Sequence, residues 1–300
     1  LVLGGLTIVV SPLVALMQDQ VAALRLAGVA ADTINSSIDR DANVAAWRRV
    51  AAGQTRLLYL APERLMTERM LEALGRLDVR LIAIDEAHCI SQWGPAFRRD
   101  YEGLSRLRGI FPDAPIIALT ATADETTRND IEARLFEGGV ETLVLGFDRP
   151  NIKLGIEPKQ DGKRQLLDFV RRHPGSSGIV YCLSRKKTEE TAAFLNSNGV
   201  TALAYHAGMS KEARDANQNS FMTLSGVVMV ATIAFGMGID KPDVAYVFHT
   251  DLPGSLEAYY QEIGRAGRDG RSAEAHMLFG LGDIRMRRMF IEDEDTSVEH

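Results

Sequence analysis

The stretch LIAIDEAHCISQW, residues 81–93, decides the fold, because an apolar run ends there in two adjacent carboxylates, Asp85 and Glu86. A buried strand that ends in such a pair can deliver a magnesium ligand and a base that orients water toward a phosphate. The alternative is that the pair only caps the helix that follows. His88 is spaced to hydrogen bond across the same site, and a lone histidine at that position can equally be structural.

The loop that usually holds the phosphates is not found in the sequence. Such loops are rich in glycine and end in Gly-Lys-Ser/Thr. The nearest approach is Gly162-Lys163, but Arg164 follows it and Glu157 occupies the position of the first glycine. The sequence therefore carries the carboxylate half of a nucleotide site.

Composition indicates a globular protein with a sizeable core, since 46% of the 300 residues are hydrophobic and 25% are charged. A net charge of -6 excludes wholesale electrostatic binding of nucleic acid, so a polyanion would need a local basic face or backbone amides. Two cysteines, Cys89 and Cys182, exclude a disulfide framework and a cysteine zinc site. Ser11-Pro12 interrupts the uncharged start of the chain, so we expect a cytoplasmic protein without a membrane segment, and a piece of a longer one.

Short apolar runs alternate with helical patterns along the chain. Strands are expected at residues 6–10, 57–60, 81–84, 116–119, 178–181, 202–205, 227–230 and 245–248. Helices are expected at residues 12–26, 43–52, 187–198 and 210–222. Near-continuous apolar strands separated by helices are typical of a parallel sheet buried on both faces. The sequence therefore predicts an α/β fold.

The series is interrupted at residues 146–163, which are rich in glycine, proline and charge and read as a connection. We expect two α/β units, at residues 1–149 and 150–282, followed by an onward connection at residues 283–300. Two such sheets in tandem are expected to enclose a cleft lined by the carboxyl ends of their strands.

The sharpest motif is YYQEIGRAGRDG, residues 259–270. The spacing of Gln261, Arg265 and Arg268 would place all three on one face of a helix. Arginines of the second unit that face the carboxylate pair of the first could complete a phosphoryl-transfer site as an arginine finger. The alternative is a solvated arginine face, although Gly264 and Gly267 are costly inside a helix.

Two weaker motifs follow other strands. In VATIAFGMGIDKPDV, residues 230–244, Gly236 and Gly238 allow tight backbone geometry, and Asp240 could accept from a ribose hydroxyl or an arginine. In TATAD, residues 120–124, Thr120 and Thr122 could hydrogen bond to the acidic pair or to His88. A plain turn and a helix cap are the respective alternatives.

Several features suit nucleic acid. Ser11-Pro12 is expected to start a helix whose free amides bind phosphate. A second helix start of this kind is expected after the next strand, at Ala61-Pro62, and Arg64 lies within it. Trp93, Phe97 and Arg98 form a loop after the acidic pair, where aromatic rings with an arginine can stack on single-strand bases. Packing of Trp93 into the core is the alternative.

Taken in order, the motifs resemble those of the RecQ family of superfamily 2 helicases. The matching stretches are IVVSPLVALMQDQ, YLAPERL, IDEAHCISQW, ALTATAD, DRPNI, GIVYCLSR, YHAGM, VATIAFGMGIDKPDV and YYQEIGRAGRDG, which run from residue 8 to residue 270. The resemblance implies two tandem RecA-like lobes and ATP-dependent 3′ to 5′ unwinding of DNA in repair and recombination, with single-stranded and duplex DNA as partners. It implies ATP and Mg²⁺ as cofactors, and zinc only in a module beyond this chain.

The resemblance also implies roles for residues. Asp85 would hold magnesium through water and Glu86 would orient the attacking water, beside His88. The residues expected to meet the nucleotide are Gln261, Arg265, Arg268 (the finger), Gly238 and Asp240. The residues expected along the DNA track are Ser11, Arg64, Trp93, Phe97, Arg98, Ser184, Arg185 and His206.

Some family features are not present in the sequence. The family's glutamine motif and phosphate loop lie upstream of residue 6, and its zinc and winged-helix modules lie downstream. Pro95-Ala96 and Arg99 depart from the family pattern in the aromatic-rich loop. We therefore expect these 300 residues alone to be deficient in ATP hydrolysis, and the first sheet to lack a central strand. The alternatives are a non-catalytic DNA-binding module and an RNA helicase of the same superfamily, against which the aromatic-rich loop argues.

Overall fold

The computed structural model describes residues 4–91, 98–136, 139–144, 146, 148–236 and 241–284. The chain folds as two compact units, residues 1–145 and 146–300, so the first unit ends slightly before the predicted limit at residue 149. Four predicted site residues lie outside the described residues, namely Trp93, Phe97, Gly238 and Asp240. None of the described helices has the length and apolar character needed to cross a membrane.

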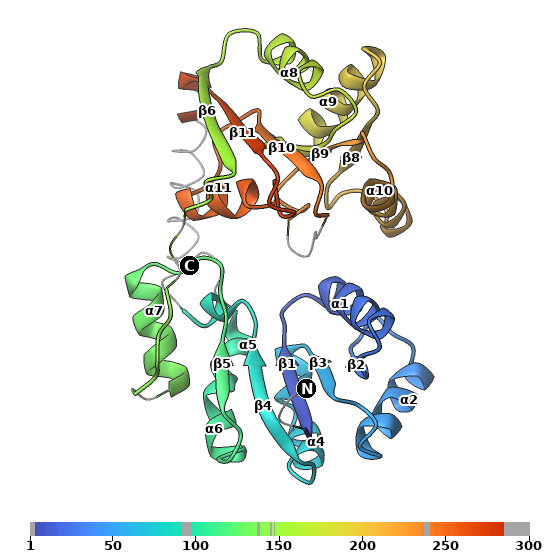
Figure 1. The fold of residues 1–300 in the computed structure, drawn as a ribbon, viewed down its shortest axis with the longest axis vertical. Helices are drawn as coiled ribbons and strands as arrows, with labels where there is room; N and C mark the ends of the chain where they lie inside the picture. The colour runs from blue at the N-terminus through green and yellow to red at the C-terminus, as the bar shows by residue number, and fades with distance from the viewer. Residues whose placement is uncertain are drawn as a thin grey trace, which may run out of the picture. The chain divides into compact units, whose positions relative to one another are not determined.

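The first unit contains a parallel five-stranded sheet in the order β2-β3-β1-β4-β5 (Figure 1). The strands are β1 (Leu6–Val10), β2 (Ala31–Ile34), β3 (Leu57–Leu60), β4 (Val79–Ile84) and β5 (Ile116–Ala118). Ile8 of the central strand is paired with Leu58 on one side and Ile82 on the other. The predicted parallel α/β architecture is confirmed in this unit.

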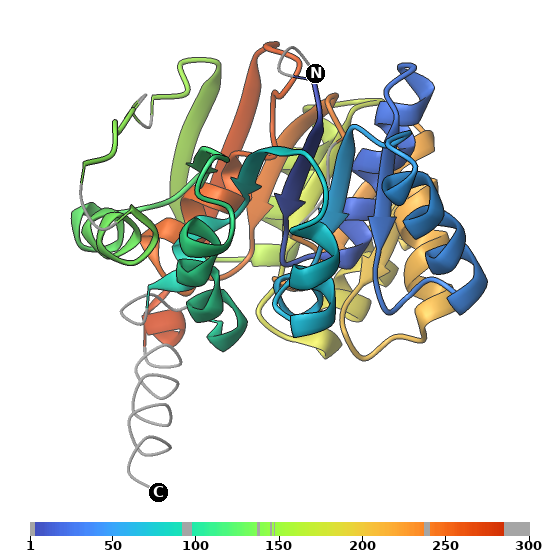
Figure 2. The same cartoon turned by 90° about the horizontal axis from the view of Figure 1, so that it is seen from below.

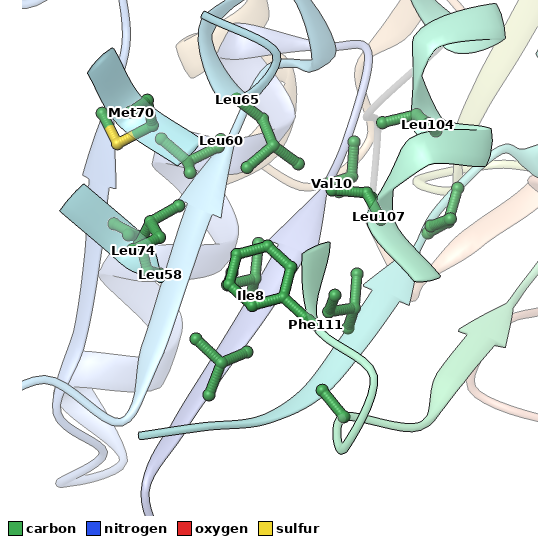
Figure 3. Packing of buried hydrophobic residues seen from close by; sticks show 14 of the residues in the cluster. Ile8, Val10, Leu58, Leu60, Leu65, Met70, Leu74, Leu104, Leu107 and Phe111 are labelled. Carbon is green, nitrogen blue, oxygen red and sulfur yellow. The ribbon is translucent and has the colours of Figure 1, made fainter. Parts of the chain in front are cut away.

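Alternate residues of these strands face two different cores. Ile8, Val10, Leu58 and Leu60 pack with helical side chains into the main core, where Figure 3 shows Leu104, Leu107 and Phe111 among their neighbours. On the opposite face, Met17 and Val21 of helix α1 pack against Tyr59 and Ala31. The alternation follows from the pleat of a strand, in which successive side chains point to opposite faces.

Helices and short turns connect these strands. They are α1 (Val14–Leu26), α2 (Arg40–Ala51), α3 (Pro62–Leu65), α4 (Glu68–Leu74), η1 (Ala87–Ile90), α5 (Arg99–Glu102), η2 (Gly103–Arg106), α6 (Leu107–Ile110), α7 (Glu125–Ile131) and η3 (Glu132–Phe136). Asp39 and Asp124 cap α2 and α7 by accepting backbone hydrogen bonds. The prediction that Ser11 caps the first helix is wrong, because α1 begins at Val14 with Leu13 in the cap position.

Strand β5 lies at one edge of the sheet and pairs with β4 alone among the described strands. Ile117 of β5 is 43% exposed, and Leu119, just beyond the strand, is 48% exposed. This edge is therefore apolar and accessible in the described part of the unit.

The second unit contains a parallel six-stranded sheet in the order β6-β11-β10-β7-β9-β8 (Figure 1). The strands are β6 (Ile152–Pro158), β7 (Ser177–Tyr181), β8 (Ala202–Tyr205), β9 (Val228–Ala231), β10 (Val244–His249) and β11 (Ala273–Phe279). The helices are α8 (Gly162–Arg171), α9 (Arg185–Ser197), α10 (Lys211–Thr223) and α11 (Leu256–Ile263). Each of these helices begins after an N-cap residue whose side chain accepts a hydrogen bond from a backbone amide of the first turn; the caps are Asp161, Ser184, Ser210 and Ser255 respectively.

The prediction that residues 146–163 only connect the units is wrong. Strand β6 lies inside that stretch and pairs with β11 along its whole length, as the adjacent strands in Figure 2 show. Strand β6 is an edge strand whose Leu154 and Ile156 are more than half exposed, so its sequence has no continuous apolar run.

Candidate functional site

The carboxylate pair of the first unit follows directly on strand β4. The amide of Asp85 donates to the Val10 carbonyl at 2.8 Å, which continues the parallel pairing with β1 by one residue. Glu86 then adopts a φ of 50°, and it is the one non-glycine residue with positive φ among those described. Such left-handed strain persists where the surroundings hold it and is concentrated at functional sites.

Asp85 is fixed at both carboxylate oxygens. The amide of Glu86 donates to Asp85 Oδ1 at 2.9 Å, and Ser11 Oγ donates to Asp85 Oδ2 at 3.4 Å. Tyr101 Oη donates to the Asp85 carbonyl at 2.9 Å. Ser11 is completely buried, so its expected place on the DNA track is corrected: its side chain donates to Asp85 from the end of the neighbouring strand.

His88 connects the carboxylate pair to the end of strand β5. Its Nδ1 lies 2.9 Å from Thr120 Oγ1 and 3.3 Å from Glu86 Oε2. Burial lowers the pKa of His88, with Arg98 contributing and Asp85 opposing, so the neutral imidazole is favoured. The suggestion that the threonine hydroxyl could bond to His88 is thus confirmed for Thr120.

Arg98 lies beside this network. Its Nη1 donates to the Pro12 carbonyl at 3.2 Å, and its amide donates to the Cys89 carbonyl at 2.9 Å. The residue therefore joins the segment after the acidic pair to the start of the α1 region. Arg64 is exposed on the short helix α3, which has Pro62 in its first turn as predicted.

The arginine motif of the second unit is not a helix face, and that prediction is wrong. Helix α11 ends at Ile263 with Gly264 as its cap, and Gly267 has a φ of +59° in the turn that follows. Arg265 is buried at 8% exposure, whereas Arg268 is exposed. The glycines end the helix instead of sitting within it, which removes the cost that they would have had there.

Arg265 packs against the end of strand β7 and the turn after β9. A Cβ on Gly236 would lie 3.3 Å from Arg265 Nη2, so the glycine gives the guanidinium its space. Burial raises the pKa of Tyr181 to about 12, with the Arg265 charge opposing that shift. Tyr181 was missed by sequence reasoning, because a tyrosine at the end of an apolar strand is not distinguished from a core residue.

A buried histidine–carboxylate contact lies just before the arginine turn. His249 Nε2 is 2.7 Å from Glu262 Oε2, and the two residues join the end of β10 to α11. Neither residue was predicted, although Glu262 directly follows Gln261 in the motif. Gln261 is half-buried on the same helix.

A second group of predicted residues gathers around Gly208. Ser184 Oγ accepts from the Lys187 amide and caps α9, so that Arg185 is the first residue of the helix. A Cβ on Gly208 would lie 3.0 Å from Arg185 Nη1 and 3.3 Å from His206 Nδ1. His206 is only 4% exposed and its Nε2 lies 2.9 Å from Glu189 Oε1, so its expected place on the DNA track is corrected to a buried position beside Glu189.

The residues around Asp85 suit a hard cation that is bound by few protein ligands. No group of three or more His, Cys, Asp or Glu side chains within the described ranges is arranged to bind a metal directly. Magnesium commonly uses one or two carboxylates together with water and substrate phosphates. The half-buried carboxylate of Asp85, oriented by Ser11 and the Glu86 amide, fits that requirement.

Comparisons with known protein families cover both units. Residues 2–131 match the DEAD/DEAH box helicase family, and residues 161–270 match the helicase conserved C-terminal domain. The chain is 46% identical to the ATP-dependent DNA helicase RecQ of Haemophilus influenzae over 97% of this chain and 47% of that protein. It is 40% identical to the RecQ of Bacillus subtilis over 98% of this chain and 50% of that protein.

Solved helicase structures share the fold. A Saccharomyces cerevisiae Dbp5 structure matches with a TM-score of 0.71 and 19% identity, over 97% of this chain and 75% of that chain. The Mycobacterium smegmatis helicase Lhr bound to single-stranded DNA and AMP-PNP matches with a TM-score of 0.67 and 23% identity, over 92% of this chain and 40% of that chain.

Fold and site together define a helicase core built from two RecA-like α/β units. Within that class, the chain belongs to the RecQ family. It spans about half the length of these two RecQ relatives.

Proposed function

We propose that the protein containing this chain is an ATP-dependent DNA helicase of the RecQ type, which couples ATP hydrolysis to 3′ to 5′ unwinding of duplex DNA. The observation that carries the proposal is the network of Asp85, Glu86, His88 and Thr120 at the carboxyl end of a parallel sheet. It places a carboxylate that can hold Mg²⁺ through water beside a second carboxylate that can orient a water, which are two parts of a phosphoryl-transfer site.

In this proposal the acidic residues have separate roles. Asp85 would hold Mg²⁺ through water, and the ion would neutralise charge on the phosphates of ATP. Glu86 would orient the attacking water and accept its proton. His88 lies between the Glu86 carboxylate and Thr120, and so links the acidic pair to the end of β5.

The second unit supplies positive charge. Arg268 and Arg265 would stabilise charge that develops on the transferred phosphoryl group, with Gln261 on the preceding helix as a further polar contact. Gly238 and Asp240 are proposed for the nucleotide from their motif alone. The expectation that these residues complete the site of the first unit stays a prediction.

The proposed DNA track uses exposed or loop residues. It comprises Arg64, Trp93, Phe97, Arg98, Ser184 and Arg185. Arg98 supports the proposed track, because its hydrogen bonds to the carbonyls of Pro12 and Cys89 hold it beside the start of the α1 region and the turn after the acidic pair. Single-strand bases stack on aromatic rings, while arginine and helix-terminal amides contact phosphates.

The test uses the protein with any flanking segments that its gene encodes. Phosphate release from ATP is measured with and without single-stranded DNA, for wild type, Glu86→Gln and the exposed control Glu72→Gln. We expect DNA to stimulate hydrolysis, Glu86→Gln to reduce it by about 100-fold or more, and the control to match wild type. Strand displacement is then compared on DNA and RNA duplexes of the same sequence.

Two outcomes would replace the proposal. DNA binding without hydrolysis in the wild-type protein would identify a non-catalytic DNA-binding module. Equal or faster displacement of the RNA duplex would identify an RNA helicase of the same superfamily.

A further inference from the structure

The turn that carries Arg265 and Arg268 is held by side chains from far away in the sequence. It runs from Gly264, the cap of α11, to the start of β11 at Ala273. The carbonyl groups at the end of a helix have no partner within that helix and need donors from elsewhere. In this turn the donors come from the segment that leads into strand β6.

Arg149 supplies the first set of donors. Its Nη1 donates to the Gly264 carbonyl at 3.5 Å, and its Nη2 donates to the carbonyls of Ala266 at 3.2 Å and Gly267 at 3.4 Å. The planar guanidinium thus reaches three carbonyls of one turn. A lysine presents a point charge and cannot reproduce this spread of contacts. The positive charge also suits the carboxyl end of α11.

Asn151 supplies the second set. Its Nδ2 donates to the carbonyls of Gly267 at 2.8 Å and Arg271 at 3.0 Å, and its own carbonyl accepts from the Ala273 amide at 2.8 Å. A Cβ on Gly267 would lie 2.5 Å from Asn151 Nδ2, so the two residues are in close contact. The side-chain bonds from Arg149 and Asn151 therefore hold the turn on both sides of Arg268.

The backbone that Arg149 and Asn151 contact determines the positions of Arg265 and Arg268. Arg265 lies between Gly264 and Ala266, and Arg268 follows Gly267, so each is adjacent to a carbonyl that Arg149 contacts. Arg265 is buried and Arg268 is exposed. The backbone of the turn sets the position of the Cα atom from which each of the two side chains extends.

We propose that Arg149 and Asn151 are positioning residues, which fix the arginine turn so that Arg268 is directed for phosphoryl transfer. The inference rests on the proposed function, and it assigns a role to the DRPN sequence at residues 148–151. A displacement of about 1 Å in a catalytic group can cost on the order of 100-fold in rate without loss of the fold.

The experiment compares Arg149→Lys, Arg149→Ala and Asn151→Ala with the control Arg164→Ala in the intact protein. Arg164 is on α8 of the same unit, is 79% exposed, and lies 3.9 Å from Asp168 in a surface ion pair. Two quantities are measured: kcat and KM of DNA-stimulated ATP hydrolysis, and amide hydrogen exchange of residues 264–272. Exchange reports the order of the turn whether or not the protein hydrolyses ATP.

We expect Arg149→Ala to lower kcat by about 10- to 100-fold with little change in KM for ATP, and to speed exchange in the turn by about 10-fold. Arg149→Lys should recover little of kcat, and Arg164→Ala should match wild type. Faster exchange with an unchanged kcat would overturn the positioning role and leave a purely structural one. Wild-type protein without DNA-stimulated hydrolysis would overturn the proposed function first, and the positioning role with it.

Discussion

His249 Nε2 and Glu262 Oε2 lie 2.7 Å apart in the interior of the second unit, with side-chain exposures of 1% and 9%. Removing one partner of a buried pair leaves a charge without compensation and typically costs about 3–5 kcal/mol. We therefore expect His249→Ala to lower the free energy of unfolding of the second unit by that amount, measured by urea denaturation followed by circular dichroism.

The control in the same unit is Glu190→Ala. Glu190 pairs with Lys186 at 3.8 Å, and these side chains are 52% and 86% exposed, so water can replace the lost contact. A smaller loss, about 1 kcal/mol or less, is expected for this more exposed pair. Equal losses in the two variants would contradict the importance that we assign to the buried pair.

The carboxylate of Asp251 is expected to make the stability of the second unit depend on pH in acid. Lys159 and Lys187 contact its carboxylate at 3.0 and 2.6 Å. Burial opposes ionisation of Asp251, but the hydrogen bonds and charges of these neighbours outweigh it and lower the pKa to about 2 from 3.8. Because the folded pKa lies below the unfolded one, this stabilisation is present above pH 3.8 and is lost as the pH falls toward 2.

The effect is worth about 2 kcal/mol. Asp251→Asn should lower stability at neutral pH and flatten the decline between pH 4 and pH 2 that wild type shows, measured by denaturation at a series of pH values. Asp168→Asn, at a carboxylate that is 65% exposed, should keep the wild-type decline. An undiminished decline in Asp251→Asn would refute the assignment.

Replacement of Ser11 is expected to change the magnesium dependence of ATP hydrolysis. Its buried hydroxyl orients Asp85 Oδ2, the group proposed to hold the ion through water. Loss of a group that orients a metal ligand commonly weakens metal affinity by 10- to 100-fold. Since the Ser11 contact is long, we expect Ser11→Ala to raise the magnesium concentration for half-maximal ATP hydrolysis by about 10-fold, with kcat largely recovered at saturating magnesium.

The control for this prediction is Ser105→Ala, because the Ser105 hydroxyl bonds to the Glu102 carbonyl on the surface. It should leave the magnesium dependence unchanged. A Ser11→Ala variant with wild-type magnesium dependence would show that Asp85 does not need this hydroxyl.

Truncation of Ile8 is expected to lower the free energy of unfolding of the first unit. The residue is completely buried between neighbouring strands (Figure 3). Ile8→Ala should cost about 2–5 kcal/mol and Ile8→Val about 1 kcal/mol, because the larger deletion leaves a cavity. Trp47 packs against the same core, so its fluorescence during denaturation reports the change. Equal costs for the two variants would mean that the site collapses around the deletion.

Strands that are buried on both faces were predicted well. β3, β7 and β9 lie within one residue of their expected positions, because their short apolar runs are typical of strands inside a parallel sheet. β6 was missed because an exposed edge strand tolerates polar residues. β2 was missed because it contains the buried residue Asp32, which forms ion pairs with Arg25 and Arg49. A strand with a charged residue at a buried position lacks the apolar pattern used for the prediction.

The site was predictable where strand order determined it. Asp85, His88 and Thr120 meet because adjacent parallel strands end at the same edge. The arrangement of Arg265 and Arg268 was not predictable from helical spacing, because Gly264 ends the helix first. The burial of Ser11 depends on tertiary packing that a local cap signal does not contain.

The margin of β5 that no described strand covers has a practical consequence for handling the protein. Its backbone donors and acceptors, beside the exposed Ile117 and Leu119, offer a template onto which a further strand can pair. A strand supplied by a neighbouring molecule at this margin would favour aggregation through the sheets, so a sample is best kept dilute and checked for monodispersity.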